Sequence, residues 1–183
     1  MAKKLPKIIN QEEFEKLFAE VTSMMSKTKC EKVKDRLNRY RIAMLLGFEA
    51  GMRLSEIVGY KDIVPALIPE MVEDAQIKIL SGKGGKDRIV PRPKRFNETA
   101  RKMLPLGLKR ITLQLFVTRL GKRILNKPIS FHTFRHGFGS HLAGQNRPLH
   151  EIQMLMGHSR LDTTGIYLHA NPTKAIEGAR DVF

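Results

Sequence analysis

The stretch ISFHTFRHGFGSHLAGQNRPLHEIQMLMGHSRLDTTGIYLHA, residues 129–170, combines helical periodicity with a high density of histidine and arginine side chains. Its apolar spacing predicts helices over His132–Ala143, Leu149–Met156 and Thr163–Ala170. In the first of these, His132 and Arg135 are three residues apart, so their side chains share one helix face. The second half of the chain is therefore expected to be mostly helical.

The first half adds a β-hairpin to this helical pattern. Residues Gln76–Leu80 alternate polar and apolar, and Arg88–Val90 follow a Gly-rich segment, residues 81–86, that forms the predicted tip. The predicted fold is α+β and mainly α-helical, with a small antiparallel sheet. Further helices are expected after the capping pair Asn10 and Glu13, over Glu31–Ala50 with Gly51 as its stop, and over Leu54–Val58, Asn97–Leu104, Thr112–Leu120 and Thr173–Arg180.

The composition indicates a polyanionic partner. Lys plus Arg number 33 and Asp plus Glu 18 among 183 residues, which gives a net charge of +15. This excess favours nucleic acid over a membrane surface, because no basic amphipathic stretch carries tryptophan anchors. The single cysteine, Cys30, indicates a reducing compartment, and the longest apolar run, Ile42–Phe48, is too short to cross a bilayer. The expected location is the cytoplasm, on DNA.

Each polar motif, taken alone, also has a purely structural interpretation. Arg53 can pair with the nearby Glu56, and Lys83 can be a solvated side chain on a turn. The glycines around Lys83 lack the terminal Gly-Lys-Ser/Thr of a phosphate loop. A zinc site at His132 and His136 would lack a cysteine within reach in sequence. The sequence therefore predicts neither a metal ion nor a cofactor.

Taken together, the motifs resemble those of the tyrosine recombinase family, which includes phage-type integrases and bacterial and archaeal chromosome-dimer resolvases. In that family a Gly-x-Arg-x-Ser-Glu segment is followed by a hairpin lysine, a His-x-x-Arg, a Gly-His and a nucleophilic tyrosine. The same order occurs here, and the resemblance extends over Pro6–Phe183. It implies six catalytic residues: Arg53, Lys83, His132, Arg135, His158 and Tyr167.

The resemblance also implies a role for each residue, and the chemistry of phosphodiesters explains why these residue types serve. Two guanidiniums, Arg53 and Arg135, can stabilise the charge that develops on the phosphate oxygens. Tyr167 is the nucleophile; because tyrosine has a pKa of about 10, it needs a base, and His132 is placed to accept its proton. Lys83 is the candidate acid for the leaving 5′ oxygen. The product is a 3′-phosphotyrosyl link, formed without metal or ATP.

The same resemblance sets expectations for organisation and partners. Residues 1–183 are expected to form a single catalytic domain, without the N-terminal clamp domain with which the family encloses DNA. The partner is expected to be double-stranded DNA, with a tetramer on DNA and a monomer in isolation. The basic segments Lys29–Arg41 and Arg88–Lys102 are candidate contact surfaces. Two alternatives remain at this point: a type IB topoisomerase-like nicking and resealing enzyme, and a non-catalytic DNA-binding accessory module.

Overall fold

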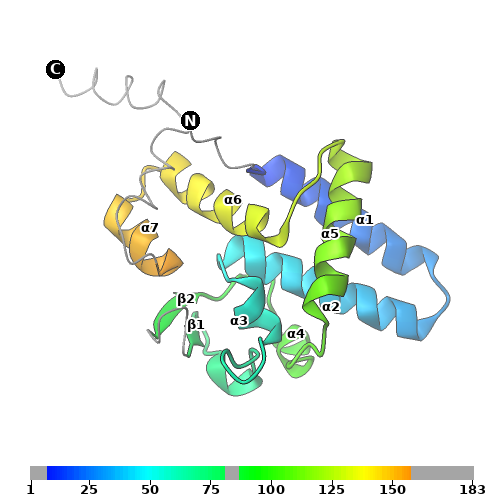
Figure 1. Ribbon diagram of the computed structural model, residues 1–183, viewed down its shortest axis with the longest axis horizontal. Coiled ribbons are helices and arrows are strands. Elements are labelled where there is room, and N and C mark those ends of the chain that lie inside the picture. Colours follow the sequence, from blue (N-terminus) through cyan, green and yellow to red (C-terminus); the bar gives the residue numbers. More distant parts are fainter. Residues whose placement is uncertain (1–7, 81–86, 158–183) are drawn as a thin grey trace.

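The structure, a computed structural model, describes residues 8–80 and 87–157 (Figure 1). Lys83, His158, Tyr167 and the helices expected over Thr163–Ala170 and Thr173–Arg180 lie outside these ranges. The described elements are α1 (Gln11–Lys27), α2 (Glu31–Glu49), α3 (Leu54–Val58), a 3-10 turn (Pro69–Met71), β1 (Gln76–Ile79), β2 (Arg88–Pro91), α4 (Glu98–Lys102), α5 (Arg110–Leu125), α6 (Phe131–Gly144) and α7 (Leu149–Met156).

The first helix begins at the predicted capping pair. The Asn10 side chain accepts a hydrogen bond from the Glu13 backbone N–H at 2.8 Å, and the Glu13 carboxylate accepts one from the Asn10 N–H at 3.2 Å. Two backbone donors that have no partner within the helix are thereby satisfied. Phe14, Leu17 and Val21 then form a buried stripe along α1, as their spacing predicts.

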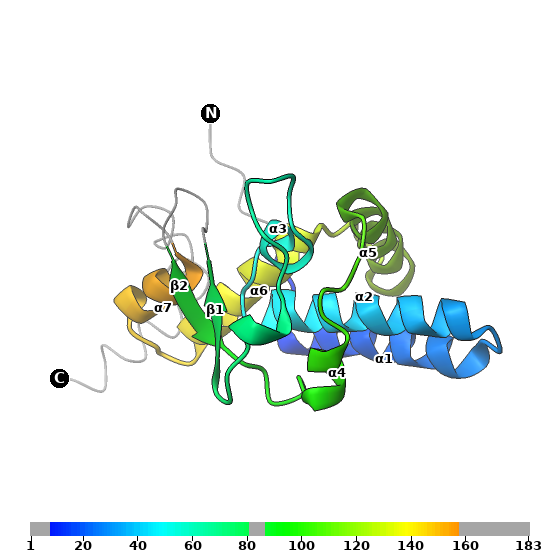
Figure 2. The ribbon, with the colours of Figure 1, turned by 90° about the horizontal axis from the view of Figure 1, so that it is seen from below.

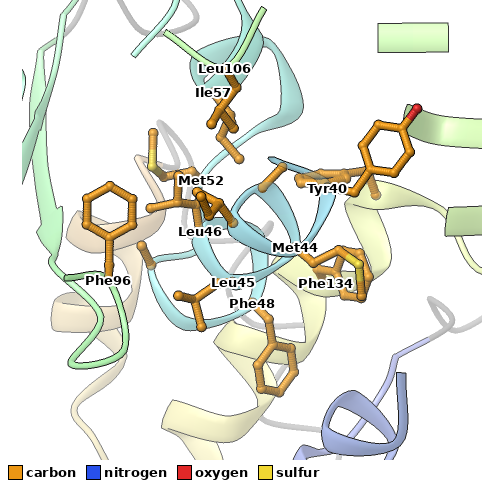
Figure 3. Close-up of a cluster of buried hydrophobic side chains, with 14 of the residues drawn as sticks. Tyr40, Met44, Leu45, Leu46, Phe48, Met52, Ile57, Phe96, Leu106 and Phe134 are labelled. Carbon is orange, nitrogen blue, oxygen red and sulfur yellow. The ribbon is translucent and has the colours of Figure 1, made fainter. Parts of the chain in front are cut away.

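Helix α2 forms the centre of the hydrophobic core. It contacts α1, α3 and α6, and its second half, from Ile42 to Phe48, is buried. Phe48 stacks on Phe14 of α1 with ring centroids 4.1 Å apart, and Phe14 meets Phe134 of α6 edge-on at 5.9 Å. Figure 3 shows the buried side chains of α2 gathered with Phe134. The charged first half of α2 remains more exposed, as the change in composition along the helix predicts.

The predicted hairpin is confirmed. Strands β1 and β2 are antiparallel, with Ile77 opposite Val90 and Ile79 opposite Arg88. Ile77 and Val90 are fully buried, which orients one face of the hairpin towards the core. Figure 2 shows the hairpin and α7 at one end of the molecule, while α1 and α2 extend towards the other. Strand β2 contacts α7, so the hairpin and the C-terminal end of the described chain lie together.

Helix α5 is longer than the sequence indicates. The sequence predicts it over Thr112–Leu120, but it begins at Arg110 and continues through Gly121 to Leu125. Glycine normally weakens a helix interior, but here a Cβ at Gly121 would lie 2.5 Å from Ile129 Cγ1. The absence of a side chain therefore lets the following segment pack closely, and Asn126, with a φ of 52°, ends the helix.

Gly51 turns the chain from α2 towards α3, and its replacement by alanine should be costly. Gly51 has a φ of +62°, and a Cβ there would lie 2.7 Å from Phe138 Cε1 of α6. Left-handed strain and overpacking together should lower the free energy of unfolding by about 3 kcal/mol. Gly107→Ala is the matched control, because Gly107 also has a φ of +62°, but a Cβ there would meet no atom within 4 Å.

Urea denaturation measures the free energy of unfolding of both variants and of the wild type. The control should lose only the strain of the left-handed backbone, about 1–2 kcal/mol. Equal losses in the two variants would show that the contact with Phe138 contributes nothing to the cost at Gly51.

No helix within the described residues is long and apolar enough to cross a membrane.

Candidate active site

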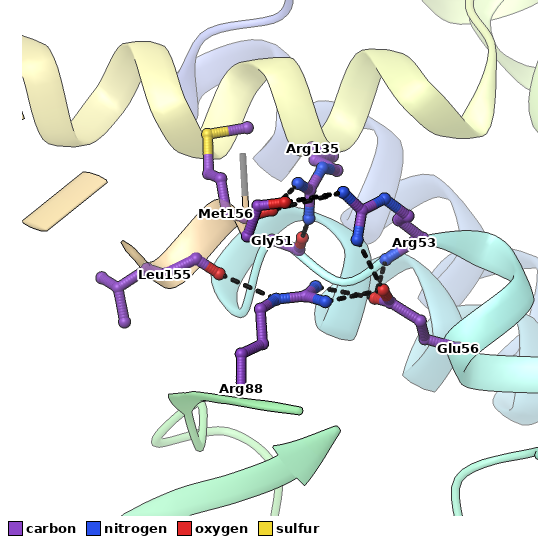
Figure 4. A network of polar contacts seen from close by, with 8 residues as sticks. Gly51, Arg53, Glu56, Arg88, Arg135, Leu155 and Met156 are labelled. Atoms are coloured by element: carbon purple, nitrogen blue, oxygen red, sulfur yellow. Dashed lines mark hydrogen bonds and ion pairs between the residues drawn. The ribbon is translucent and has the colours of Figure 1, made fainter. Parts of the chain in front are cut away.

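Three of the six predicted catalytic residues lie in the described part of the chain: Arg53, His132 and Arg135. Arg53 immediately precedes α3, whereas His132 and Arg135 lie on α6. These segments are far apart in sequence, yet they meet at the C-terminal end of α7 (Figure 4). The structure therefore brings together the predicted residues that it describes.

Arg53 makes contacts in two directions. Its Nη1 forms an ion pair with Glu56 Oε1 at 2.8 Å, the local pairing that the sequence allows. Its Nη2 faces the end of α7, 3.5 Å from the Met156 carbonyl oxygen and 3.3 Å from that of Gly157. About a fifth of the side chain, 21%, remains exposed to solvent. One part of the guanidinium is therefore anchored, and another faces backbone acceptors.

Arg135 is fully buried on α6, with 1% exposure. Its Nη1 donates to the Gly51 carbonyl oxygen at 2.5 Å, and its Nη2 donates to the Met156 carbonyl oxygen. Because Arg53 and Arg135 both direct a donor at Met156, their guanidiniums converge on one acceptor (Figure 4). Two adjacent positive charges directed at one oxygen make this position suited to an anion.

The carboxylate of Glu56 lies at the base of this cluster. Its two oxygens accept from the backbone N–H and Nη1 of Arg53 and from Nη1 and Nη2 of Arg88, all at 2.7–2.8 Å. Burial alone would raise the pKa of Glu56, but the hydrogen bonds and charge of Arg88, together with Arg53, outweigh it and hold the pKa at about 2. Glu56 is therefore ionised throughout the physiological range.

Arg88 is the member of the cluster that the sequence does not identify. It lies at the start of β2, its side chain is only 7% exposed, and its Nε donates to the Leu155 carbonyl oxygen at 3.1 Å. Only its position just beyond the Gly-rich hairpin tip marks it in the sequence. Its partner, Glu56, is 32 residues away, and no local pattern links the two.

His132 and His136 form a pair on the exposed side of the cluster. Their rings meet edge-on with centroids 4.3 Å apart. Loss of hydration lowers the pKa of His132, and the positive charges of Arg135 and Arg53 lower it further. Burial lowers the pKa of His136 to about 4, with smaller contributions from the charges of His132 and Arg135. His132 is therefore neutral near pH 7 and able to accept a proton. No third potential metal ligand joins the pair within the described residues.

The segment Arg88–Lys102 is less available as a DNA-contact surface than its charge indicates. Arg92 pairs with Glu98 at 2.8 Å, Arg95 pairs with Glu15 at 2.9 Å and also with Glu49, and Arg101 contacts Glu98. Together with Arg88, these arginines are engaged by the protein's own carboxylates. The sequence could not show this, because most of the partners come from other elements.

The comparisons with known proteins agree with this arrangement. The model of the phage integrase family matches residues 7–174. Among curated relatives, tyrosine recombinase XerD of Ralstonia nicotianae is 33% identical over 153 residues, covering 72% of this chain and 48% of the relative. Tyrosine recombinase XerC of Pseudomonas fluorescens is 32% identical over 142 residues, covering 68% and 46%. The chain spans about half the length of the curated relatives it matches.

Solved structures establish the fold. The post-cleavage complex of XerH site-specific recombinase with a palindromic difH substrate has a TM-score of 0.71 at 24% identity, covering 96% of this chain and 53% of that one. The catalytic domain of bacteriophage HP1 integrase has a TM-score of 0.64 at 18% identity, covering 97% and 95%. With the family model matched over most of the chain, this protein belongs to the phage integrase family of tyrosine recombinases.

Proposed function

We propose that this chain is the catalytic domain, residues 1–183, of a site-specific DNA recombinase that cleaves and rejoins DNA through Tyr167. The observation that carries the proposal is the convergence of Arg53 and Arg135 on one acceptor, the Met156 carbonyl oxygen. A scissile phosphate offers oxygens of the same acceptor type with a full negative charge, so it is the stronger ligand for two guanidiniums. The match to almost the whole catalytic domain of HP1 integrase supports the domain assignment.

The tyrosines of the described residues support Tyr167 as the nucleophile. Tyr40 is buried at 4% exposure, with its ring 4.5 Å from that of Phe116. Tyr60 is 39% exposed, but its ring is covered by Arg110, whose guanidinium carbon lies 4.4 Å from the ring centroid. Both are engaged in contacts with other parts of the fold, whereas Tyr167 stands at the family position for the nucleophile.

The proposed reaction is a transesterification in which every proton has a carrier. The Tyr167 oxygen bonds to phosphorus and gives its proton to His132, which is neutral near pH 7 because its pKa is lowered. The bond from phosphorus to the 5′ oxygen breaks, and Lys83 protonates that oxygen. Arg53 and Arg135, assisted by His158, stabilise the charge on the phosphate. Reversal by a 5′-hydroxyl rejoins the strand, so the exchange needs no hydrolysis.

The proposed partner is double-stranded DNA, on which four copies assemble while the isolated chain is a monomer. The net charge of +15 supports binding to a polyanion. The relative XerH was solved in complex with its difH substrate, which supports the same kind of partner here.

Covalent capture tests the proposal. The chain is incubated with supercoiled plasmid, the reaction is stopped with detergent, and nicked DNA is examined for attached protein. Attachment, mapped by mass spectrometry to a tyrosine, is the expected result. A second, labelled duplex distinguishes the chemistry further, because a recombinase joins strands of two molecules whereas a topoisomerase-like enzyme only relaxes one. DNA binding without any attached protein would contradict the proposed enzymatic function.

A further inference from the structure

Arg88 connects three elements of the candidate site. It belongs to β2, its two terminal nitrogens contact both oxygens of Glu56 on α3 at 2.7 and 2.8 Å, and its Nε contacts Leu155 at the end of α7. All three nitrogens of its guanidinium are therefore directed at acceptors. A planar fork held in this way has one orientation, and lysine cannot reproduce it.

The contact between Arg88 and Glu56 bears on Arg53. Glu56 Oε1 is shared between Arg53 Nη1 and Arg88 Nη1, so neither arginine has this carboxylate to itself. Without Arg88, each Glu56 oxygen would lose one of its two donors, and a two-bond pair between Glu56 and the Arg53 guanidinium would compete with the outward direction of Arg53 Nη2. Arg88 thus limits the number of hydrogen bonds that the Glu56 carboxylate can form with the Arg53 guanidinium.

Close packing fixes Arg88 on its other side. Gly157 has a φ of +58°, and a Cβ there would lie 2.8 Å from Arg88 Cδ. The stem of Arg88 therefore lies directly against the turn whose carbonyl oxygen faces Arg53 Nη2 at 3.3 Å. A shift of Arg88 would displace two of the contacts that orient Arg53, the one to Glu56 and the one to Gly157.

We propose that Arg88 is a positioning residue: acting through Glu56 and the end of α7, it holds Arg53 in the orientation that contacts the scissile phosphate. Arg88 itself does not touch the reacting atoms. The inference rests on the proposed function, since it assigns Arg88 a part in the strand cleavage carried out by that site. It extends the site from the six family positions to a buried residue at the start of β2.

The test compares Arg88→Gln with a matched control, Arg92→Gln. Arg92 lies four residues away, is also largely buried at 12% exposure, and pairs with Glu98 rather than Glu56. The rate of covalent capture is measured at saturating DNA and at a temperature where circular dichroism shows each variant folded. Arg88→Gln should slow capture by about 100-fold, as a misplaced catalytic group does, with little change in DNA affinity. Arg92→Gln should capture DNA at the wild-type rate.

Two further measurements separate positioning from a merely structural role. Arg88→Lys keeps the positive charge and much of the stability but cannot make the paired hydrogen bonds of a planar guanidinium. Its capture rate should therefore remain at least about tenfold below that of the wild type. A substrate with a neutral methylphosphonate at the scissile position requires less charge stabilisation from Arg53. On that substrate the loss caused by Arg88→Gln should shrink, as it should for Arg53→Ala, which serves as the benchmark.

The outcomes distinguish this inference from the proposed function. Wild-type capture together with undiminished capture by Arg88→Gln overturns the positioning role and leaves the recombinase activity standing. A loss in Arg88→Gln that is equal on the charged and neutral substrates also overturns it, because the effect would not pass through Arg53. If the wild-type chain forms no covalent complex, the proposed function fails first, and the role of Arg88 in it fails as a consequence.

Discussion

Phenylalanine in place of Tyr167 should reduce covalent capture of DNA by at least about 1,000-fold, because the variant lacks the oxygen proposed to form the protein–DNA bond. DNA affinity should stay close to that of the wild type, since the substitution removes no Lys or Arg side chain. Capture is measured by detergent-resistant attachment of the protein to nicked plasmid, and affinity by fluorescence anisotropy with a labelled duplex. The two readings together separate loss of chemistry from loss of binding.

The other two tyrosines provide matched controls, since Tyr40→Phe and Tyr60→Phe remove the same hydroxyl elsewhere. Tyr40 packs on Phe116 through its ring, and Tyr60 packs under Arg110, so both contacts survive the substitution. Both control variants should capture DNA as the wild type does. Covalent attachment that persists in Tyr167→Phe, or that disappears in one of the controls, would assign the nucleophile to another residue.

Glutamine in place of Glu56 should lower the free energy of unfolding by about 3–5 kcal/mol, the usual cost of removing one partner from a buried ion pair. Glu56 is 3% exposed, and its carboxylate is the shared partner of Arg53 and Arg88. Its loss leaves the buried guanidinium of Arg88 without a counter-charge, and it leaves the positive charges of Arg53 and Arg88 close together with no carboxylate between them. Urea denaturation at neutral pH gives the difference directly.

Glu98→Gln is the control for this prediction, because Glu98 pairs with Arg92 at the surface and its side chain is 60% exposed. Such pairs contribute no more than about 1 kcal/mol. A loss at Glu56 no larger than the loss at Glu98 would show that the buried carboxylate contributes little to stability.

The stability of the wild type should also depend on pH through Glu56. Its pKa is about 2 in the folded protein against an ordinary value of 4.5, so the folded state favours the ionised form. This contribution is fully present above pH 4.5 and is lost as the pH falls from 4.5 towards 2. Glu56→Gln lacks it, so the stabilities of the two proteins should converge in acid. A difference that stays constant from neutral pH down to pH 2 would contradict the assigned pKa.

Much of the fold follows from local patterns. The capping pair at Asn10, the short helix Leu54–Val58 and the hairpin can all be predicted from neighbouring residues, because each depends on spacing within a few positions. The predicted extent of α5 is wrong. Its continuation through Gly121 depends on Ile129 packing against it, and that contact is a tertiary one that no local pattern contains.

The candidate site divides in the same way. Arg53, His132 and Arg135 can be named in advance because the order of the motifs resembles a known family. The convergence of Arg53 and Arg135 on Met156 and the burial of Arg135 cannot be predicted in this way, because both depend on how α6 and α7 pack. Arg88 escapes prediction for a related reason: a basic residue beside a basic hairpin indicates a solvated surface until its carboxylate partner is known.

The three arginine contacts at the end of α7 restrict how the chain length can vary. Arg88, Arg135 and Arg53 engage the carbonyl groups of three consecutive residues, Leu155–Gly157. One inserted residue within the helix would rotate these carbonyls by about 100° and move them by about 1.5 Å along the axis. All three contacts would be lost at once. Insertions and deletions should therefore be tolerated in the connection at residues 145–148, but not between Leu149 and Gly157.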